Sequence, residues 1–205
     1  MKGNKSIIEI SGAKAKQLFD EGYQLAYETK TKNKPWNKIF ELWIIAAKAG
    51  NTRAQFYVGT CYDLSKGVDK DISEAFNWYM KAAKKGKMEA QYNIGFFYKK
   101  GEFVKQDYKK AVYWYSLAAK QGDIEAQRDL GYCYFYGEGV KQDYLKAIYW
   151  YKKAAKQADD KALYNLGLCY EFGDGVKQSS RWAKYYYTKA SKFGNKKATN
   201  KLKKL

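Results

Sequence analysis

The chain contains no histidine in 205 residues. Histidine is the commonest general base in catalysis and the commonest metal ligand, and it often activates a nucleophilic serine or cysteine. Its absence argues against most hydrolytic and metal-dependent chemistry. We therefore expect a protein that is not an enzyme, with no catalytic residues, no metal site and no cofactor.

Cysteines and long apolar runs are scarce as well. The three cysteines form no C-x-x-C pair and are too few for a disulfide framework. No apolar run approaches the ~20 residues of a membrane-spanning helix. The apolar stretch between Ile7 and Ile10 is too short and too interrupted for a signal peptide. These features predict a cytoplasmic protein without a membrane span.

Arginine is rare among many basic residues. The chain has 39 Lys and Arg against 21 Asp and Glu, a net charge of +18, but only Arg53, Arg128 and Arg181 are arginine. A strong positive charge suggests a polyanion such as nucleic acid as the partner, whereas arginine dominates the recognition of base edges. We therefore favour lysines that cover the solvent faces of helices. A basic nucleic-acid-binding surface is the alternative.

Aromatic and small residues are plentiful and recur with a fixed period. The chain is 46% hydrophobic and 18% aromatic, which predicts a folded protein. The segment GEFVKQDYKKAVYWYSLAAKQ at Gly101 recurs 36 residues later as GEGVKQDYLKAIYWYKKAAKQ, with sixteen of 21 positions identical. The same shift aligns further columns: Gly59, Gly95, Gly131, Gly167; Ala54, Ala90, Ala126, Ala162, Ala198; Tyr62, Tyr98, Tyr134, Tyr170; and Trp78, Trp114, Trp150. A period of this length is typical of a solenoid.

Each unit is predicted to fold as two helices. Asp123 is placed to cap the first helix of one unit, and Gly131 lets a neighbouring helix approach closely. The second helix is predicted to begin near Asp143 and to end near Gln157 and Ala158. The tryptophan column is expected in the core, since it lies on the same face as the small alanines.

These columns resemble the Sel1-like repeat family, a branch of the tetratricopeptide superfamily. The segment from Ala90 to Gly122, AQYNIGFFYKKGEFVKQDYKKAVYWYSLAAKQG, carries the resemblance almost throughout, with Phe103 in place of one loop glycine. The resemblance implies an all-α solenoid of helix-turn-helix repeats in a right-handed superhelix. It also implies a scaffold or adaptor that mediates protein–protein interaction.

The repeat pattern divides the chain into predicted segments of one continuous solenoid domain. IFELWIIAAKAG, from Ile39, matches a second helix, so a degenerate capping repeat is expected before the regular ones. Atypical terminal units suit a stacked array, whose ends face solvent. The predicted segments are an N-terminal segment with the capping repeat at 1–50, four repeats at 51–86, 87–122, 123–158 and 159–194, and a C-terminal cap at 195–205.

Two sequence features invite a chemical interpretation. Cys61, Cys133 and Cys169 share one repeat column with Phe97, which favours buried apolar side chains. A cysteine-rich branch of the resembled family joins the helices of each unit by a disulfide, but the second cysteine of every pair is missing here. We therefore expect three free thiols.

The second feature is the S-x-x-K motif that begins at Ser11, the nucleophile motif of penicillin-recognising enzymes. Its S-D-N and K-T-G partners are absent, and it is expected in a frayed N-terminus. A β-lactam-binding, hydrolase-like protein is therefore the least favoured alternative.

The resemblance implies that first helices line a concave groove that binds a peptide or protein. Arg128 interrupts an otherwise aromatic column, and arginine beside aromatic rings suits an acidic partner. The alternative is that the rings pack against the second helices. The predicted groove residues are Tyr92, Phe96, Lys99, Arg128, Tyr132, Phe135, Tyr164 and Leu168.

Arg128 gives the most specific prediction about the groove, because the equivalent positions of the other repeats are aromatic: Phe56, Tyr92 and Tyr164. The substitution Arg128→Tyr restores the repeat pattern. We expect it to keep or raise stability and to weaken binding of an acidic partner.

Overall fold

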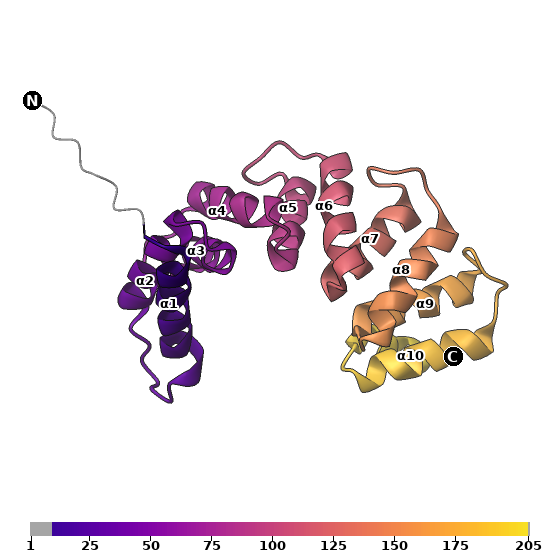
Figure 1. Cartoon of the computed structure of the whole chain (residues 1–205). Helices are drawn as coiled ribbons and strands as arrows, with labels where there is room; N and C mark the ends of the chain where they lie inside the picture. The colour runs from indigo at the N-terminus through magenta and orange to yellow at the C-terminus, as the bar shows by residue number, and fades with distance from the viewer. Residues whose placement is uncertain (1–9, 205) are drawn as a thin grey trace, which may run out of the picture. The chain divides into compact units, whose positions relative to one another are not determined.

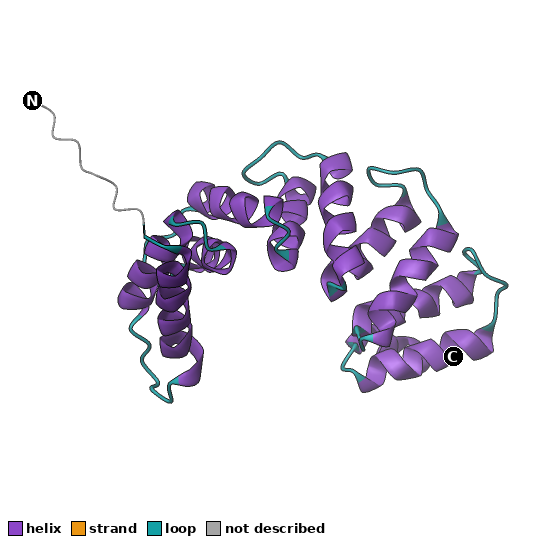
Figure 2. Cartoon of the chain, viewed as in Figure 1, coloured by secondary structure: helices purple, strands orange, loops and turns teal. Residues whose placement is uncertain are grey.

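The computed structural model describes residues 10–204, and all of its regular structure is helical (Figures 1 and 2). Except for Ile10, the N-terminal apolar stretch lies outside these residues. The helices are α1 (Gly12–Tyr23), the π-helix η1 (Gln24–Glu28), α2 (Trp36–Lys48), α3 (Thr52–Leu64), α4 (Ile72–Lys84), α5 (Met88–Lys100), α6 (Tyr108–Gln121), α7 (Ile124–Tyr136), α8 (Tyr144–Lys156), α9 (Asp160–Phe172), α10 (Ser180–Lys192) and α11 (Lys196–Leu202).

Consecutive helices pack on one another inside two compact units, Met1–Ile94 and Gly95–Leu205. In the first unit α1 packs on α2, α2 on α3 and α3 on α4. In the second unit each helix from α6 to α10 packs on the next, ending with α10 on α11. The predicted all-α solenoid of helix pairs is confirmed, and the hand of its superhelix stays a prediction.

Side-chain caps begin the helices where the sequence places them. Asp123 accepts a hydrogen bond from the backbone N–H of Ala126 at 2.7 Å, and Asp143 accepts one from Lys146 at 2.9 Å. Both predicted caps are confirmed. An N-terminal carboxylate satisfies a backbone donor that has no partner within the helix.

The core of each repeat is built on a contact between a glycine and a tyrosine. Glycines of the first helices face tyrosines of the second, and a Cβ added at Gly131 would lie only 2.7 Å from ring carbons of Tyr151. Because glycine has no side chain, the two helices approach closely there. We call this contact the glycine–aromatic contact; it pairs Gly59 with Tyr79, Gly95 with Tyr115, Gly131 with Tyr151 and Gly167 with Tyr187.

The tryptophan column is less buried than the sequence predicts. Trp78 is 6% exposed, as expected for the core, but Trp114 and Trp150 are only half-buried. The expectation is wrong for those two, because the next residue in each helix is the tyrosine that enters the core. Tyr115 and Tyr151 are at most 1% exposed.

The three cysteines are buried and free, which confirms the thiol prediction for the described chain. Burial raises the pKa of Cys133 to about 12, since the thiolate is costly to form away from water. Each cysteine therefore packs as a small apolar side chain.

Candidate functional site

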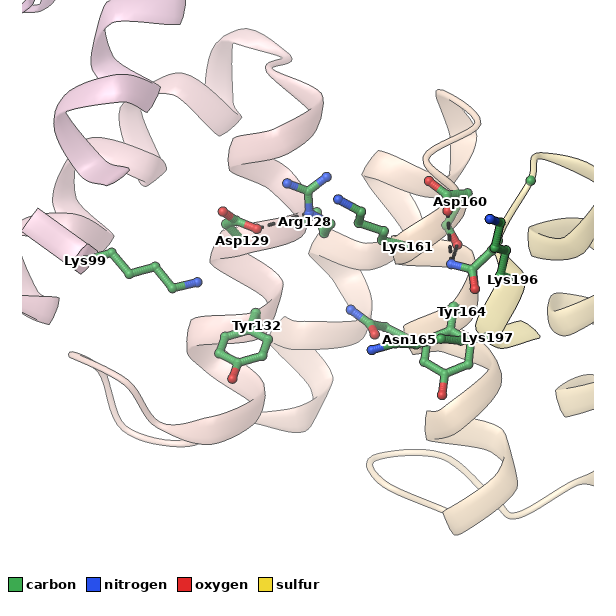
Figure 3. Close-up of a pocket in the computed structure, with 12 residues that line it drawn as sticks. Lys99, Arg128, Asp129, Tyr132, Asp160, Lys161, Tyr164, Asn165, Lys196 and Lys197 are labelled. Atoms are coloured by element: carbon green, nitrogen blue, oxygen red, sulfur yellow. Dashed lines mark hydrogen bonds and ion pairs between the residues drawn. The ribbon is translucent and has the colours of Figure 1, made fainter. Parts of the chain in front are cut away.

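A cavity of about 590 Å³ opens along the first helices of the second unit (Figure 3). Helices α7 and α9 supply its long walls, Lys99 at the end of α5 lies on one side, and the α10–α11 turn closes the other. We call it the first-helix cavity. Its lining residues are Lys99, Arg128, Asp129, Tyr132, Asp160, Lys161, Tyr164, Asn165, Gly194, Asn195, Lys196 and Lys197.

The cavity brings together four of the eight predicted groove residues: Lys99, Arg128, Tyr132 and Tyr164. The Lys99 ammonium lies 4.5 Å from the centre of the Tyr132 ring. Burial is the main cause of a raised pKa at Tyr132, with the nearby Glu138 carboxylate adding to it. The Tyr132 phenol is therefore a neutral hydrogen-bond donor at physiological pH.

The other four predicted residues do not line this cavity. Tyr92 belongs to the first unit, and Phe96 is 41% exposed with the Lys100 ammonium near its ring. Phe135 packs edge-to-face on Tyr144 of α8 at 5.0 Å. Leu168 packs against the core cluster that holds Tyr187. Phe135 and Leu168 thus behave as the alternative interpretation expects, with side chains packed toward second helices.

Arg128 is held between two carboxylates rather than left free for a ligand. Its Nε lies 3.0 Å from Asp129 and a terminal nitrogen lies 2.9 Å from Asp159. Asp159 also caps α9 by accepting a hydrogen bond from Ala162. The Arg128 side chain is only 14% exposed and that of Asp159 only 9%. Arg128 therefore fastens α7 to the start of α9, and its charge is compensated inside the protein.

Other members of the Arg128 column also have structural contacts. The Tyr164 ring lies 5.6 Å from the buried Tyr187 ring, and the Phe56 ring lies 5.7 Å from that of Tyr79. Each therefore supports the aromatic residue of its own glycine–aromatic contact. Tyr164 has both roles, since it also lines the cavity.

The charges available to a ligand come from lysines that sequence reasoning mostly missed. Both acidic residues of the cavity are engaged: Asp129 pairs with Arg128, and Asp160 accepts a hydrogen bond from Asn195 at 3.0 Å (Figure 3). Lys161, Lys196 and Lys197 are exposed and take part in no ion pair within the described residues. The cavity is thus net positive. Lys196 and Lys197 lie in the segment expected to act only as a cap, which is why the sequence did not single them out.

A smaller cavity of about 360 Å³ adjoins the first and shares Tyr164 and Lys197 with it. Glu171 lies in its wall, 2.7 Å from the Lys201 ammonium, and accepts a hydrogen bond from the hydroxyl of Tyr187. Burial acts to raise the pKa of Glu171, but these two hydrogen bonds outweigh it and lower the pKa. This carboxylate is therefore also compensated.

The S-x-x-K motif is an ordered helix start, so the expectation of a frayed segment is wrong. Ser11 caps α1 and its side chain accepts a hydrogen bond from the backbone N–H of Lys14 at 3.2 Å. The Lys14 ammonium contacts Gln17 instead of the serine hydroxyl. Across residues 10–204 no group of three or more Cys, Asp or Glu is arranged to hold a metal ion, and no helix there has the length and apolarity to cross a bilayer.

Helix pairs stacked in register, with an open cavity along the first helices, define a helical repeat protein. The Sel1 repeat model matches residues 52–87, 89–123, 124–159 and 160–195, and the chain belongs to the Sel1 repeat family. Proteins of this family are generally protein-interaction scaffolds and typically non-catalytic. None of the curated proteins compared with the sequence matches it.

Solved structures of related proteins share the fold. The protective antigen c5321 of uropathogenic Escherichia coli is 35% identical over 92% of this chain, with a TM-score of 0.86; the chain spans only 40% of that protein. A Sel1 repeat protein from Oxalobacter formigenes is 32% identical, with a TM-score of 0.82, over 97% of this chain and 79% of its own. The cysteine rich protein B of Helicobacter pylori, 23% identical over 65% of this chain and 96% of its own with a TM-score of 0.50, shares the fold alone.

Proposed function

We propose that the chain is a non-catalytic scaffold whose first-helix cavity binds an acidic segment of a protein partner. The observation that carries the proposal is the imbalance of charge in the cavity. Lys161, Lys196 and Lys197 are exposed, whereas the neighbouring carboxylates are already engaged by Arg128 and Asn195.

The chemistry of the walls favours a peptide that mixes carboxylates with an apolar or aromatic side chain. Charge-assisted hydrogen bonds from lysine to carboxylate are stronger than neutral ones. The rings of Tyr132 and Tyr164 add apolar area and hydroxyl groups, and tyrosine is enriched at protein interfaces. A volume of about 590 Å³ accommodates several side chains.

The proposal is tested by selecting peptides from a random display library and measuring their affinity by calorimetry. We expect acidic sequences to be enriched, and the double substitution Lys161→Gln with Lys197→Gln to weaken their binding by roughly tenfold or more. The matched control is Lys152→Gln on α8, an exposed lysine outside the cavity. Enrichment without acidic residues, or equal losses in both variants, would contradict the proposal.

We also propose that the protein acts in a reducing compartment such as the cytoplasm. Cys61, Cys133 and Cys169 are buried free thiols, and unpaired cysteines are typical of reducing environments. Fractionation of the source cells with an antibody against the chain tests this assignment; recovery only outside the cytoplasm would contradict it.

A further inference from the structure

The second helices of the second unit carry charge of one sign only. Helices α6, α8 and α10 contain no Asp or Glu. The caps of α6 and α8, Asp107 and Asp143, pair with Lys110 and Lys146 of the first turns at 3.6 and 3.2 Å. Helix α10 is capped by Ser179, and its buried Tyr187 donates a hydrogen bond to Glu171 of α9. The basic residues of the three helices are Lys109, Lys110, Lys120, Lys146, Lys152, Lys153, Lys156, Arg181, Lys184, Lys189 and Lys192.

The connections of α6 and α8 hold the ends of these two helices near each other. The turn before α8 packs on the start of α6, where a Cβ at Gly139 would collide with the backbone oxygen of Tyr108. At the other end, the Gln157 amide donates a hydrogen bond to the carbonyl of Gly122 at 3.0 Å.

The start of α10 is linked to the start of α8 in the same way. The turn before α10 packs on Tyr144 at the start of α8, where a Cβ at Gly175 would lie 2.6 Å from the tyrosine Cβ. Further along, Ala155 of α8 packs against the cluster that joins Leu163 of α9 to Ala183 and Tyr187 of α10. Equivalent residues of the three helices therefore repeat along one surface.

A tyrosine projects from each of these helices at the same repeat position. Tyr113, Tyr149 and Tyr185 are 58%, 53% and 43% exposed. Each packs edge-to-face on the next residue of its helix, a Trp or Tyr, with ring centres 5.0–5.2 Å apart. Lys153 and Lys189 hold their ammonium groups 5.6 and 4.8 Å from the centres of the Tyr149 and Tyr185 rings. We call this surface the second-helix face.

The exposed tyrosines are not needed for the core. Each second helix already buries a different tyrosine in its glycine–aromatic contact, such as Tyr115 in α6 and Tyr151 in α8. A row of exposed rings among lysines is thus an addition to the scaffold, and exposed patches of this kind mark interaction sites.

We propose that the second-helix face binds single-stranded nucleic acid, with bases stacked on the tyrosine rings and phosphates paired with the lysines. The absence of carboxylates on the three helices fits a polyanion. Regularly repeated rings fit a polymer with a planar group on each unit, because base–aromatic stacking combined with basic side chains is how proteins bind single strands without sequence preference.

Single strands suit this face better than the other anionic partners. A duplex keeps its bases stacked on one another, so the tyrosine rings cannot reach their faces. Ten of the eleven cations are lysine, which neutralises phosphates but lacks the planar fork that reads base edges.

The test measures fluorescence anisotropy of labelled oligothymidine and oligouridine of about 20 nucleotides at about 50 mM salt with the full chain. We expect both single strands to bind and their affinity to fall steeply with added salt. Replacing Tyr113, Tyr149 and Tyr185 with alanine should weaken binding by roughly fivefold or more per ring. The triple Tyr→Phe variant should bind as the wild type does, since it keeps every ring.

Matched controls separate stacking from charge and from misfolding. Tyr136→Ala removes a ring that is 57% exposed on a first helix, and it should leave binding unchanged. A triple Tyr→Leu variant keeps apolar area without a ring and should bind poorly. Circular dichroism melting of every variant reports whether the fold is kept.

Three results would overturn the proposal. One is binding of a duplex or of inorganic polyphosphate as tight as that of the single strands. Another is equal affinity of the Tyr→Ala, Tyr→Leu and wild-type proteins, all folded, for oligothymidine. The third is binding only to vesicles that contain phosphatidylserine, with none to any oligonucleotide.

Discussion

The helix pair α1–α2 and the regular pair α7–α8 solve the same packing problem with different residues. In α7–α8 the Tyr151 ring packs over Gly131. In α1–α2 the ring is that of Trp43, and a Cβ added at Gly22 would lie 2.6 Å from its Nε1. Trp43 also donates a hydrogen bond to the carbonyl of Phe19 at 3.2 Å. The glycine–aromatic contact is thus kept in a pair whose first helix departs from the repeat pattern.

The difference between the two pairs lies in spacing. Gly22 and Trp43 are one residue further apart in the chain than Gly131 and Tyr151, and the π-helix η1 follows directly after α1. A π-helix takes one more residue per hydrogen-bonded turn than an α-helix. The close approach of two helices at a glycine is therefore the feature that both pairs share. The regular repeats reach it with one spacing between glycine and aromatic residue, and α1–α2 reaches it with a spacing one residue longer.

The largest expected effect comes from adding a side chain at the glycine where the two helices of a pair approach closely. Gly131→Ala places a methyl group against the Tyr151 ring and 3.2 Å from the backbone oxygen of Ala147, and Gly22→Ala meets the Trp43 ring. We expect each to lower the free energy of unfolding by about 2–3 kcal/mol, as overpacking does. Urea denaturation of both variants measures the loss.

Gly12→Ala is the matched control for these two substitutions, because nothing lies within 4 Å of a Cβ at that helical position. It should be neutral or stabilising by up to about 1 kcal/mol, since alanine favours helix more than glycine does. If Gly22→Ala behaves like Gly12→Ala, the comparison between the two pairs fails.

The next largest effect on stability is expected at Arg128. This residue distinguishes α7 from the first helices of the other repeats, which carry an aromatic residue at the equivalent position. The sequence alone predicts that Arg128→Tyr keeps or raises stability, but the ion pairs with Asp129 and Asp159 reverse that expectation. We now expect a loss of about 1–3 kcal/mol, because carboxylates with little exposure lose their partner. Urea denaturation checks the value.

The Asp159→Asn background tests whether the ion pair is the cause of that loss. Asparagine keeps the capping oxygen at the start of α9 and removes the charge. In this background Arg128→Tyr should therefore cost clearly less. An unchanged cost would show that the ion pair with Asp159 is not the cause of the loss. A melting temperature of Arg128→Tyr equal to that of the wild type would restore the original expectation.

The sequence predicts the parts of the molecule that depend on local pattern. The period of identical residues predicts the helix pairs, and aspartates before apolar runs predict caps such as Asp123 and Asp143. The ion pairs of Arg128 could not be predicted, since Asp159 is 31 residues away and its distance depends on how the helices pack. The same is true of Lys196 and Lys197, which reach the cavity only because α11 turns back onto α10.

A smaller effect is expected at the turn between repeats. Ala158 has a φ of +64°, whereas glycine holds the equivalent positive φ at Gly86, Gly122 and Gly194. Left-handed backbone costs a residue with a side chain roughly 1–2 kcal/mol. Ala158→Gly should therefore stabilise the protein by about 1 kcal/mol, measured by urea denaturation. Gly122→Ala should destabilise it by a similar amount, and a loss of stability in Ala158→Gly would argue against strain at this turn.

The smallest effect concerns the hydroxyl end of the buried tyrosines. Tyr187 donates its hydroxyl hydrogen to Glu171, while Tyr79 donates to Asp63 at the longer distance of 3.4 Å. The hydrogen bonds from Lys201 and Tyr187 lower the pKa of Glu171 in the folded state despite burial. A carboxylate with a lowered folded-state pKa stabilises the protein above its unfolded pKa, and that contribution is lost as the pH falls through the folded-state value.

Glu171→Gln tests this contribution, because it keeps the side-chain shape and removes both the charge and its titration. The wild type should exceed the variant in stability above about pH 5, by less than about 1 kcal/mol because the ion pair is partly exposed to solvent. The gap should close as the pH falls below the unfolded-state pKa of glutamate, about 4.3, and passes through the lower folded-state value. Asp63→Asn at the equivalent position of the first unit is the matched control, and its longer hydrogen bond should give a smaller loss of stability at pH 7. Urea denaturation at each pH measures both variants. A gap that stays constant from pH 7 to pH 2.5 would show that the Glu171 charge adds nothing to the contact, and that packing of the Tyr187 ring on Gly167 is sufficient in every repeat.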